Sequence, residues 1–172
     1  MTRTVLFCFL VTFAILINLR KISACNGYKT KLHYLENCDS NSIIKVDNNF
    51  TVDLTKNCEV IANGCIHTVG FQKAYMRATI RKNGMVMHRM EADLCDTMSK
   101  ASEEAKNYLR LFGLPDRCPV EPGKNCQDES TKADISKYKR YLSLARGLIQ
   151  IEAMIEHENG KSCIKAETEI TK

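Results

Sequence analysis

The sequence predicts an all-β protein, an antiparallel β-sandwich that carries one amphipathic helix and is stapled by disulfides. Apolar and polar residues alternate with a period of two over several segments, which is typical of strands with one buried face. Two Asn-Gly pairs join such segments in the manner of hairpin turns. Eight of the nine cysteines follow an N-terminal export signal, and an even number in an oxidising compartment favours four disulfides.

The first 24 residues are typical of a secretory signal peptide, with a basic start at Arg3, an apolar run from Val5 to Leu19 and a small residue at Ala24. This run is shorter than the roughly 20 residues that span a bilayer, so a cleaved signal is favoured over a transmembrane anchor. We expect residues 25–172 to form a single mature domain, because no repeat, linker or change of composition divides them. The domain is expected to be secreted or delivered to the lysosomal lumen.

Removing the signal changes the net charge. The full chain has 25 basic and 20 acidic residues, a formal charge of +5, and the signal holds three of the basic residues and no acidic one. The mature chain is then nearly neutral, at +2, and lacks a long cluster of Lys and Arg. The long-range field that drives nucleic-acid binding is therefore missing, and no nucleic-acid partner is expected.

Strands are predicted wherever the period of two is clear. Phe50, Val52 and Leu54 alternate with polar residues, and so do the apolar residues of 74–81. Asn83-Gly84 turns this second strand into residues 85–88, and Asn159-Gly160 turns residues 149–153 into 164–170. Both pairs predict hairpins with type I′ turns, because Asn and Gly tolerate the positive φ that this turn requires.

One segment has helical periodicity instead. Between Thr97 and Phe112, charged residues such as Glu103 and Glu104 lie on the polar side of the predicted helix. The apolar residues at helical spacing are Met98, Ala101, Ala105, Tyr108, Leu109 and Phe112. Gly113 favours a C-terminal stop and Pro115 cannot continue a helix, so a single amphipathic helix is predicted here.

The mature cysteines favour disulfides over a metal site. The chain has no Cys-x-x-Cys or His-x-x-x-His pair, and Cys65-Ile66-His67 alone offers too few ligands. We therefore expect neither a metal nor another cofactor. Asn49-Phe50-Thr51 is an N-glycosylation sequon, which predicts a glycan on a solvent-facing Asn49.

Several landmarks, taken in order, resemble those of the ML lipid-recognition proteins, in particular their ganglioside (sphingolipid) activator branch. They are Leu35-Glu36-Asn37-Cys38-Asp39, Leu94-Cys95-Asp96, Phe112-Gly113-Leu114-Pro115 with Cys118-Pro119, Gly147 with Ile149-x-Ile151-Glu152, and Gly160-Lys161-Ser162-Cys163-Ile164-Lys165. Each motif is weak alone, and the ordered set is moderately specific. Residues 81–92 and position 116 lack cysteines that the activators carry, and the chain has no Trp. Ganglioside specificity and a hexosaminidase partner are therefore not carried over.

The resemblance implies an immunoglobulin-like, cup-shaped β-sandwich that holds lipid tails in an apolar interior and has no catalytic machinery. It also implies a Cys38–Cys163 bridge between the first and last strands and a Cys95–Cys118 bridge between the two ends of the helix.

The remaining four cysteines are paired from the residues around them. A Cys58–Cys65 bridge is favoured, because Asn63-Gly64 between the two cysteines is typical of a tight turn. A Cys25–Cys126 bridge then follows by elimination.

The alternation of inward and outward residues along each strand, together with the resemblance, gives the candidate lipid-binding residues. They are the apolar residues expected on inward strand faces and on the inward side of the helix: Met76, Ala78, Ile80, Val86, Met87, Leu109, Phe112, Ile149, Ile151, Ala153 and Ile155. Four methionines near one hairpin, at 76, 85, 87 and 90, would suit an adaptable lining. The residues alone favour an ordinary filled core for such a stripe, and the resemblance is what favours a lipid cavity.

The most basic and aromatic segment of the mature chain covers residues 137–146. We interpret it as a rim loop or edge strand that touches an anionic membrane transiently, with cations at the headgroups and apolar side chains inserted. The residues assigned to this contact are Lys137, Tyr138, Lys139, Arg140, Tyr141 and Leu142. A solvated edge strand protected by its charge is an equal alternative.

These expectations favour a secreted, non-enzymatic lipid-binding or lipid-transfer protein. Its ligand would be a glycolipid, phospholipid, sterol or fatty acid, which it would present to a partner hydrolase or receptor. A carrier or co-receptor for a hydrophobic signal, chemosensory or immune, is the alternative. A small secreted hydrolase is a distant third, because the chain has no His-Glu-x-x-His or Gly-x-Ser-x-Gly motif and His67, His88 and His157 are expected in strands or turns.

Overall fold

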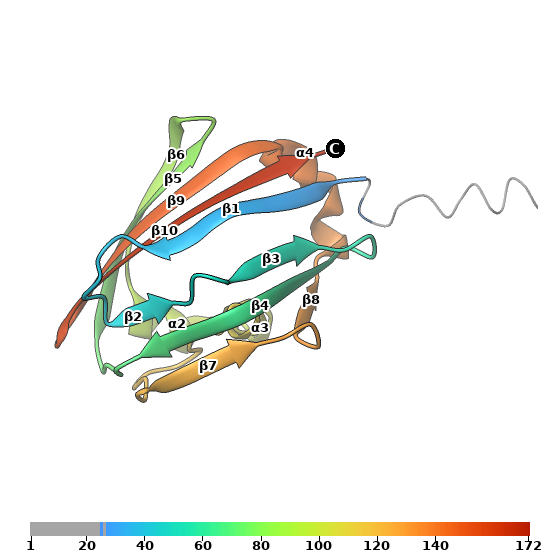
Figure 1. Ribbon diagram of the computed structural model, residues 1–172. Helices are drawn as coiled ribbons and strands as arrows, with labels where there is room; N and C mark the ends of the chain where they lie inside the picture. Colours follow the sequence, from blue (N-terminus) through green and yellow to red (C-terminus); the bar gives the residue numbers. More distant parts are fainter. Residues whose placement is uncertain (1–24, 26) are drawn as a thin grey trace, which may run out of the picture.

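Two antiparallel β-sheets lie face to face in the computed structural model, which describes Cys25 and residues 27–172 (Figure 1). The signal peptide expected over residues 1–24 lies outside the described residues. The all-β sandwich predicted from the period-two alternation is confirmed. Among the described residues, no helix has the length and apolar character needed to cross a membrane.

The first sheet has five strands and β9 at its centre. Its order is β1 (Lys29–Asn37), β10 (Gly160–Thr171), β9 (Gly147–His157), β5 (Ala74–Lys82) and β6 (Met85–Asp93). Asn83 and Gly84 connect β5 to β6 with φ values of 49° and 81°, so the first predicted type I′ turn is confirmed.

The second hairpin is present, and its predicted turn is wrong by one residue. His157 pairs with Gly160, so Glu158 and Asn159 form the turn and Asn159 has no positive φ. Both turn side chains bind the segment that precedes β5. The Glu158 carboxylate accepts the backbone N–H groups of Gln72 and Lys73, and the Asn159 amide donates to the Gly70 carbonyl at 2.9 Å.

The second sheet is built around β4 (Glu59–Thr68). On one side β4 pairs with β2 (Ile44–Val46) and β3 (Thr51–Leu54), and on the other with β7 (Gly123–Gln127) and β8 (Lys132–Asp134). Gly64 lies inside β4 with φ +135°, where a Cβ atom would approach Phe50 to 2.7 Å. Asn63-Gly64 is therefore part of a strand rather than the tight turn expected between Cys58 and Cys65.

The single predicted helix is two helices, α2 (Leu94–Lys100) and α3 (Glu103–Leu111). The break follows from capping, because Ala101 is extended and the Ser102 hydroxyl accepts the Ala105 N–H at 3.2 Å to begin a new helix. The segment expected to be a rim loop or edge strand is helical as well. It forms the 3₁₀ helix η1 (Ser136–Tyr141) and the short α4 (Leu142–Ala145).

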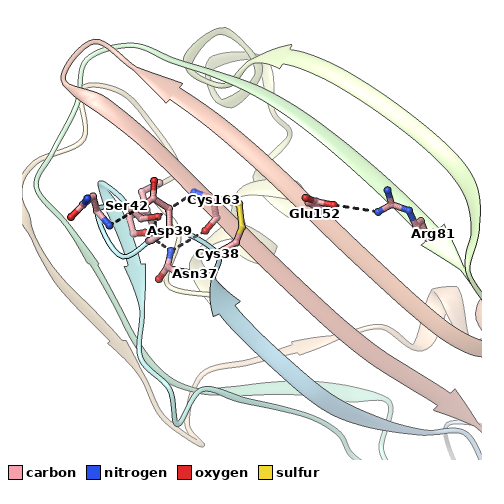
Figure 2. The surroundings of a disulfide bond; sticks show 9 residues. Asn37, Cys38, Asp39, Ser42, Arg81, Glu152 and Cys163 are labelled. Carbon is pink, nitrogen blue, oxygen red and sulfur yellow. Dashed lines mark hydrogen bonds and ion pairs between the residues drawn. A yellow bond between two sulfur atoms is a disulfide. The ribbon is translucent and has the colours of Figure 1, made fainter.

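Two of the expected disulfides are present. Cys38 and Cys163 join the end of β1 to β10 with Cα atoms 5.2 Å apart (Figure 2). Cys95 of α2 and Cys118 have Cα atoms 5.5 Å apart.

The other two predicted pairings, Cys58–Cys65 and Cys25–Cys126, are wrong. The bonds are Cys25–Cys58 and Cys65–Cys126. The extended β4 carries Cys65 away from Cys58, since each strand residue rises about 3.3 Å. Cys65 instead lies directly opposite Cys126 in the register of β4 and β7.

The main core lies between the sheets and under α3. Its buried residues are Ile44, Val46, Phe50, Ala62, Ile66, Phe71, Ala74, Leu111, Val120 and Ile155. A second, smaller cluster joins Cys25, Cys58 and Leu142. Leu142 thereby ties α4 to the N-terminal disulfide.

Candidate functional site

The candidate lipid-binding residues on β5 and β9 share the inner face of the first sheet. Ile155 of the main core belongs to this face, and residues two apart along each strand continue it. The cross-strand rows on this face are Met76–Ile155–Ser162, Met90–Ala78–Ala153–Ile164, Ile80–Ile151–Ala166–Leu35 and Lys82–Ile149–Thr168. The register thus brings seven of the predicted residues together on one surface.

This inner face is packed at its Ile155 end and at Ile170, which is 9% exposed near the other end, and it is only partly covered between them. Ile155 is 6% exposed, and Met76 packs against the same core. Ile80, Ile149 and Ala153 are only partly buried, and they belong to neither hydrophobic cluster found among the described residues. Ile151 keeps 40% of its surface exposed.

Small side chains lie at the centre of this face, and one of them, Ala78, is buried at 7% exposure. Ala78 and Ala153 are cross-strand neighbours, and Ala166 is opposite Ile151. Alanine leaves room that a larger apolar residue would fill, so these positions leave a depression at the centre of the face. Met90, one of the four methionines near this hairpin, lies opposite Ala78 and is 37% exposed.

Val86 and Met87 do not continue the inner rows, which corrects the prediction for them. A register shift after Ile80 places Val86 opposite Arg81 and leaves Met87 without a Cα partner on β5. Figure 2 shows the Arg81 guanidinium directed at Glu152, 3.4 Å away, on the outer face of the sheet. Val86 and Met87 are 46% and 61% exposed at the tip of the hairpin.

Only one of the two helical candidates shares the main core with Ile155. Phe112 packs against the main core, and Leu109 is half-buried outside it. Leu111, which was not assigned to the apolar face, is the helical residue most deeply buried, at 2% exposure. The break before Ser102 shifts the phase of α3, so that Tyr108, Leu111 and Phe112 form its inward face.

Two pockets of the described residues lie elsewhere, and neither includes a predicted lipid-binding residue. One of about 260 Å³ lies beside β7 and is lined by Ile44, Ile66, Phe71, Val120 and the loop 113–121. A more polar one of about 510 Å³ lies between α3 and β8 and reaches Lys137.

The basic segment is mostly solvent-exposed. Tyr138 and Tyr141 are 40% and 47% exposed, and Lys139 and Arg140 are exposed as well. The Arg140 guanidinium lies over the Tyr141 ring at 4.7 Å. Leu142 is 9% exposed and faces the protein, so it is not available for the membrane insertion assigned to it.

Lys137 is engaged by a neighbouring carboxylate. It forms an ion pair with Glu104 of α3, and the Tyr138 hydroxyl donates to the same carboxylate at 3.0 Å. The hydrogen bond from Lys137, and after it the one from Tyr138, lowers the pKa of the Glu104 carboxyl. The Glu104 carboxylate in turn raises the pKa of Lys137. Lys137 therefore contributes less free positive charge than Lys139 and Arg140.

An apolar surface that was not predicted from the sequence adjoins this segment. The Lys82 ammonium donates to the Leu144 carbonyl at 2.6 Å, and the Leu148 N–H donates to the Asn83 side chain at 2.9 Å. These bonds bring the β5–β6 hairpin next to α4. The exposed apolar residues there are Met85, Val86, Met87, Tyr141 and Leu144, which we call the apolar rim.

His33, His67 and His157 have side-chain partners, whereas His88 is exposed. His157 Nε2 lies 3.0 Å from the Ser162 hydroxyl, which is fully buried and accepts the Ile44 N–H. Burial lowers the pKa of the His157 imidazole. A nucleophile without solvent access cannot reach a substrate, so this Ser–His contact joins strands instead. Among the described residues no group of three or more His, Cys, Asp or Glu is placed to hold a metal ion.

Asn49 is exposed in the connection between β2 and β3. Glycosylation at this sequon stays a prediction.

Comparisons with known proteins find a close relative. The chain is 38% identical over 173 residues to the sporozoite-associated mosquito saliva protein 1 of Anopheles gambiae, with 98% of this chain and 94% of that protein aligned. No family model matches the sequence. A structure of chicken MD-1 complexed with lipid IVa aligns with a TM-score of 0.33 and 9% identity, over 80% of this chain and 96% of that one.

Proposed function

The chain belongs to the family of the sporozoite-associated mosquito saliva protein 1, and we propose that it is a secreted lipid-binding protein without catalytic activity. Secretion is supported by the four disulfides, which are typical of exported proteins, and by the relative, which is a saliva protein by name. The bridges Cys38–Cys163 and Cys95–Cys118 are those that the ML resemblance implies.

The observation that carries this proposal is the half-covered inner face of the first sheet. A filled core would bury its central apolar side chains, yet Ile151 is 40% exposed and flanked by Ile80 and Ala166. An acyl chain or sterol laid along Ile149, Ile151 and Ala153 would remove this apolar area from water.

Two substitutions on β9 test the site. Ile151→Asp places a carboxylate on the inner face, and Met154→Asp places one on the outer face of the same strand at a residue of nearly equal exposure, 41%. We expect Ile151→Asp to weaken binding of a fluorescent fatty acid or phospholipid by roughly tenfold or more, because the charge would face lipid tails. Met154→Asp should bind as the wild type does.

Native mass spectrometry of the secreted wild type identifies the lipid, whether a glycolipid, phospholipid, sterol or fatty acid. A protein that carries no lipid and binds neither probe would refute the proposal. Equal binding by the two variants would refute the assignment of the site to the inner face.

We also propose that the apolar rim and the basic segment contact an anionic membrane when lipid is exchanged. The rim supplies Met85, Met87 and Leu144 at 67%, 61% and 71% exposure, and Lys139 and Arg140 lie on the adjacent helix. Exposed apolar residues bordered by cations suit an interface between acyl chains and anionic headgroups.

Flotation with liposomes tests this contact. The triple variant Lys137→Ala, Lys139→Ala, Arg140→Ala should bind phosphatidylserine-containing vesicles less than the wild type, with no difference on phosphatidylcholine alone. A matched variant with Ala at Lys45, Lys56 and Lys73 removes three exposed cations elsewhere and should float normally. Equal flotation of all three proteins would remove the basic segment from the membrane contact.

A further inference from the structure

Strand β6 is an edge strand whose free side lies open. β6 pairs with β5 on one side and has no strand partner on the other among the described residues, and it forms the outer edge of its sheet in Figure 1. At the opposite edge, β1 lies next to β3 of the second sheet (Figure 1). Eight of the nine residues of β6 are exposed, and none is Pro or Lys. Long edges of this kind are usually blunted, because they readily pair with another strand.

The residues of β6 alternate in a self-complementary way. Arg89, Glu91 and Asp93 lie on the outer face, whereas His88 and Met90 lie on the inner face, opposite Ile80 and Ala78 of β5. Arg89 has no ion-pair partner within the described part of the chain. Glu91 accepts a hydrogen bond from the Tyr75 hydroxyl at 2.8 Å through one of its two oxygens.

We propose that the protein self-associates by antiparallel pairing of β6 with β6 of a second copy, about a two-fold axis at Met90. In this register each Arg89 lies opposite Glu91 of the other copy, so the axis generates two ion pairs. Met90 lies opposite Met90 of the second copy on the inner face, and His88 lies opposite Ala92. The two sheets of five strands become one sheet of ten.

The charges on β6 also disfavour the neighbouring registers. A two-fold pairing that keeps the inner faces on the same side can move its axis only by whole residues, from Met90 to Arg89 or to Glu91. The first would oppose two arginines and the second two glutamates, and like charges directly opposite each other destabilise a strand pair. The Met90 register is therefore favoured over both.

The pairing leaves the lipid-binding face and most of the apolar rim uncovered. The paired residues run from Met87 to Asp93, whereas Ile149 and Ile151 lie on the central strand and Leu144 lies on α4. The proposal is thus independent of the proposed function. Its occupant is a second copy of this chain, because in this register Arg89 meets Glu91 twice and Met90 meets Met90.

Sedimentation equilibrium over a concentration series tests the pairing with single charge reversals. We expect the wild type to form a dimer. Arg89→Glu and Glu91→Arg should each weaken dimerisation by roughly tenfold or more, because each variant places two pairs of like charges opposite each other in its homodimer. An equimolar mixture of the two variants should recover dimers near wild-type strength. In the mixed dimer, both carboxylates of the first variant lie opposite the two guanidinium groups of the second, so each of the two sites again holds an ion pair.

Lys31→Glu on β1 is the control, since it reverses an exposed charge on the opposite edge strand and should leave the dimer intact. Thermal melts of each variant alone establish that it is folded. A wild type that stays monomeric throughout the series would overturn the proposal. So would single variants that dimerise as the wild type does, or a mixture no more associated than its components.

Discussion

At the scale of single residues, His157 is held in its neutral form by its surroundings. Burial lowers the pKa of its imidazole, Nε2 contacts the Ser162 hydroxyl, and Nδ1 is buried with no hydrogen-bond partner among the described residues. A base with a lower pKa in the folded state binds more protons when unfolded. Its contribution to stability is therefore full above the unfolded pKa of about 6.5 and is lost as the pH falls toward the folded value.

We therefore predict that the melting temperature decreases as the pH falls below about 6.5 and that His157→Gln flattens this decrease. The Glu158 carboxylate opposes the lowering of the His157 pKa, but burial outweighs it. The contribution of Glu158 to stability is lost only at more acidic pH, below about 4.3, because the N–H groups of Gln72 and Lys73 lower the pKa of its carboxyl. Melts of His88→Asn, which alters an exposed histidine, serve as the control. An unchanged slope in His157→Gln would assign the pH dependence to other groups.

Leu111 and Leu109 lie on the same helix, but their substitution by Ala is expected to lower the free energy of unfolding by different amounts. Leu111 is 2% exposed in the main core, so Leu111→Ala should lower the free energy of unfolding by about 3 kcal/mol. Leu109 is half-buried outside the core clusters, and Leu109→Ala should cost about 1 kcal/mol or less. Urea denaturation measures both values. The reverse order would mean that α3 packs with the phase predicted from an unbroken helix.

At the scale of elements, the boundary between α2 and α3 depends on one cap. The Ser102 hydroxyl accepts the Ala105 N–H, so Ser102→Ala should destabilise the protein by about 1 kcal/mol. Ser102→Asp keeps an acceptor at the cap and should stay near the wild type in the same urea titration. If both substitutions cost the same, the side-chain cap does not stabilise α3.

Strand elements were predictable because a period of two needs only neighbouring residues. The β5–β6 hairpin follows from Asn83-Gly84, whose positive φ values suit the turn. The Glu158-Asn159 turn was not predictable, since its form depends on bonds to Gln72, Lys73 and Gly70 far away in sequence. The predicted inward positions of Val86 and Met87 were wrong for a similar reason. The register shift after Ile80 depends on the pairing of two strands and cannot be seen in either strand alone.

At the scale of the whole molecule, sequence spacing alone misassigned two disulfides. Asn63-Gly64 is typical of a tight turn, but its neighbours extend through β4, and Cys65 meets Cys126 across the sheet. The candidate lipid-binding face was predictable in its strand residues, since inward parity places Ile80, Ile151 and Ala153 together. The apolar rim was not predictable, because it forms only when Lys82 binds the Leu144 carbonyl of α4 and Asn83 binds the Leu148 N–H of β9.

The disulfides are expected to differ in how much each stabilises the protein. Cys38 and Cys163 are 125 residues apart in the sequence, and Cys95 and Cys118 are 23 apart. A bond that closes a longer loop removes more conformational entropy from the unfolded chain, by about 5 kcal/mol for the first and about 3 kcal/mol for the second at room temperature. The paired substitution Cys38→Ser, Cys163→Ser should therefore destabilise the protein more than Cys95→Ser, Cys118→Ser.

Denaturant titrations of the two double variants measure this difference. Asn37 keeps hydrogen bonds to the Ile44 and Cys163 carbonyls, at 2.8 and 3.2 Å, which still join β1 to β2 and β10 when the Cys38–Cys163 bond is absent (Figure 2). The loss should therefore act mainly through the unfolded state, with far-ultraviolet circular dichroism of the folded variant unchanged. A larger loss for the Cys95–Cys118 pair would show that this bond stabilises the folded state directly, by holding α2 against the loop before β7.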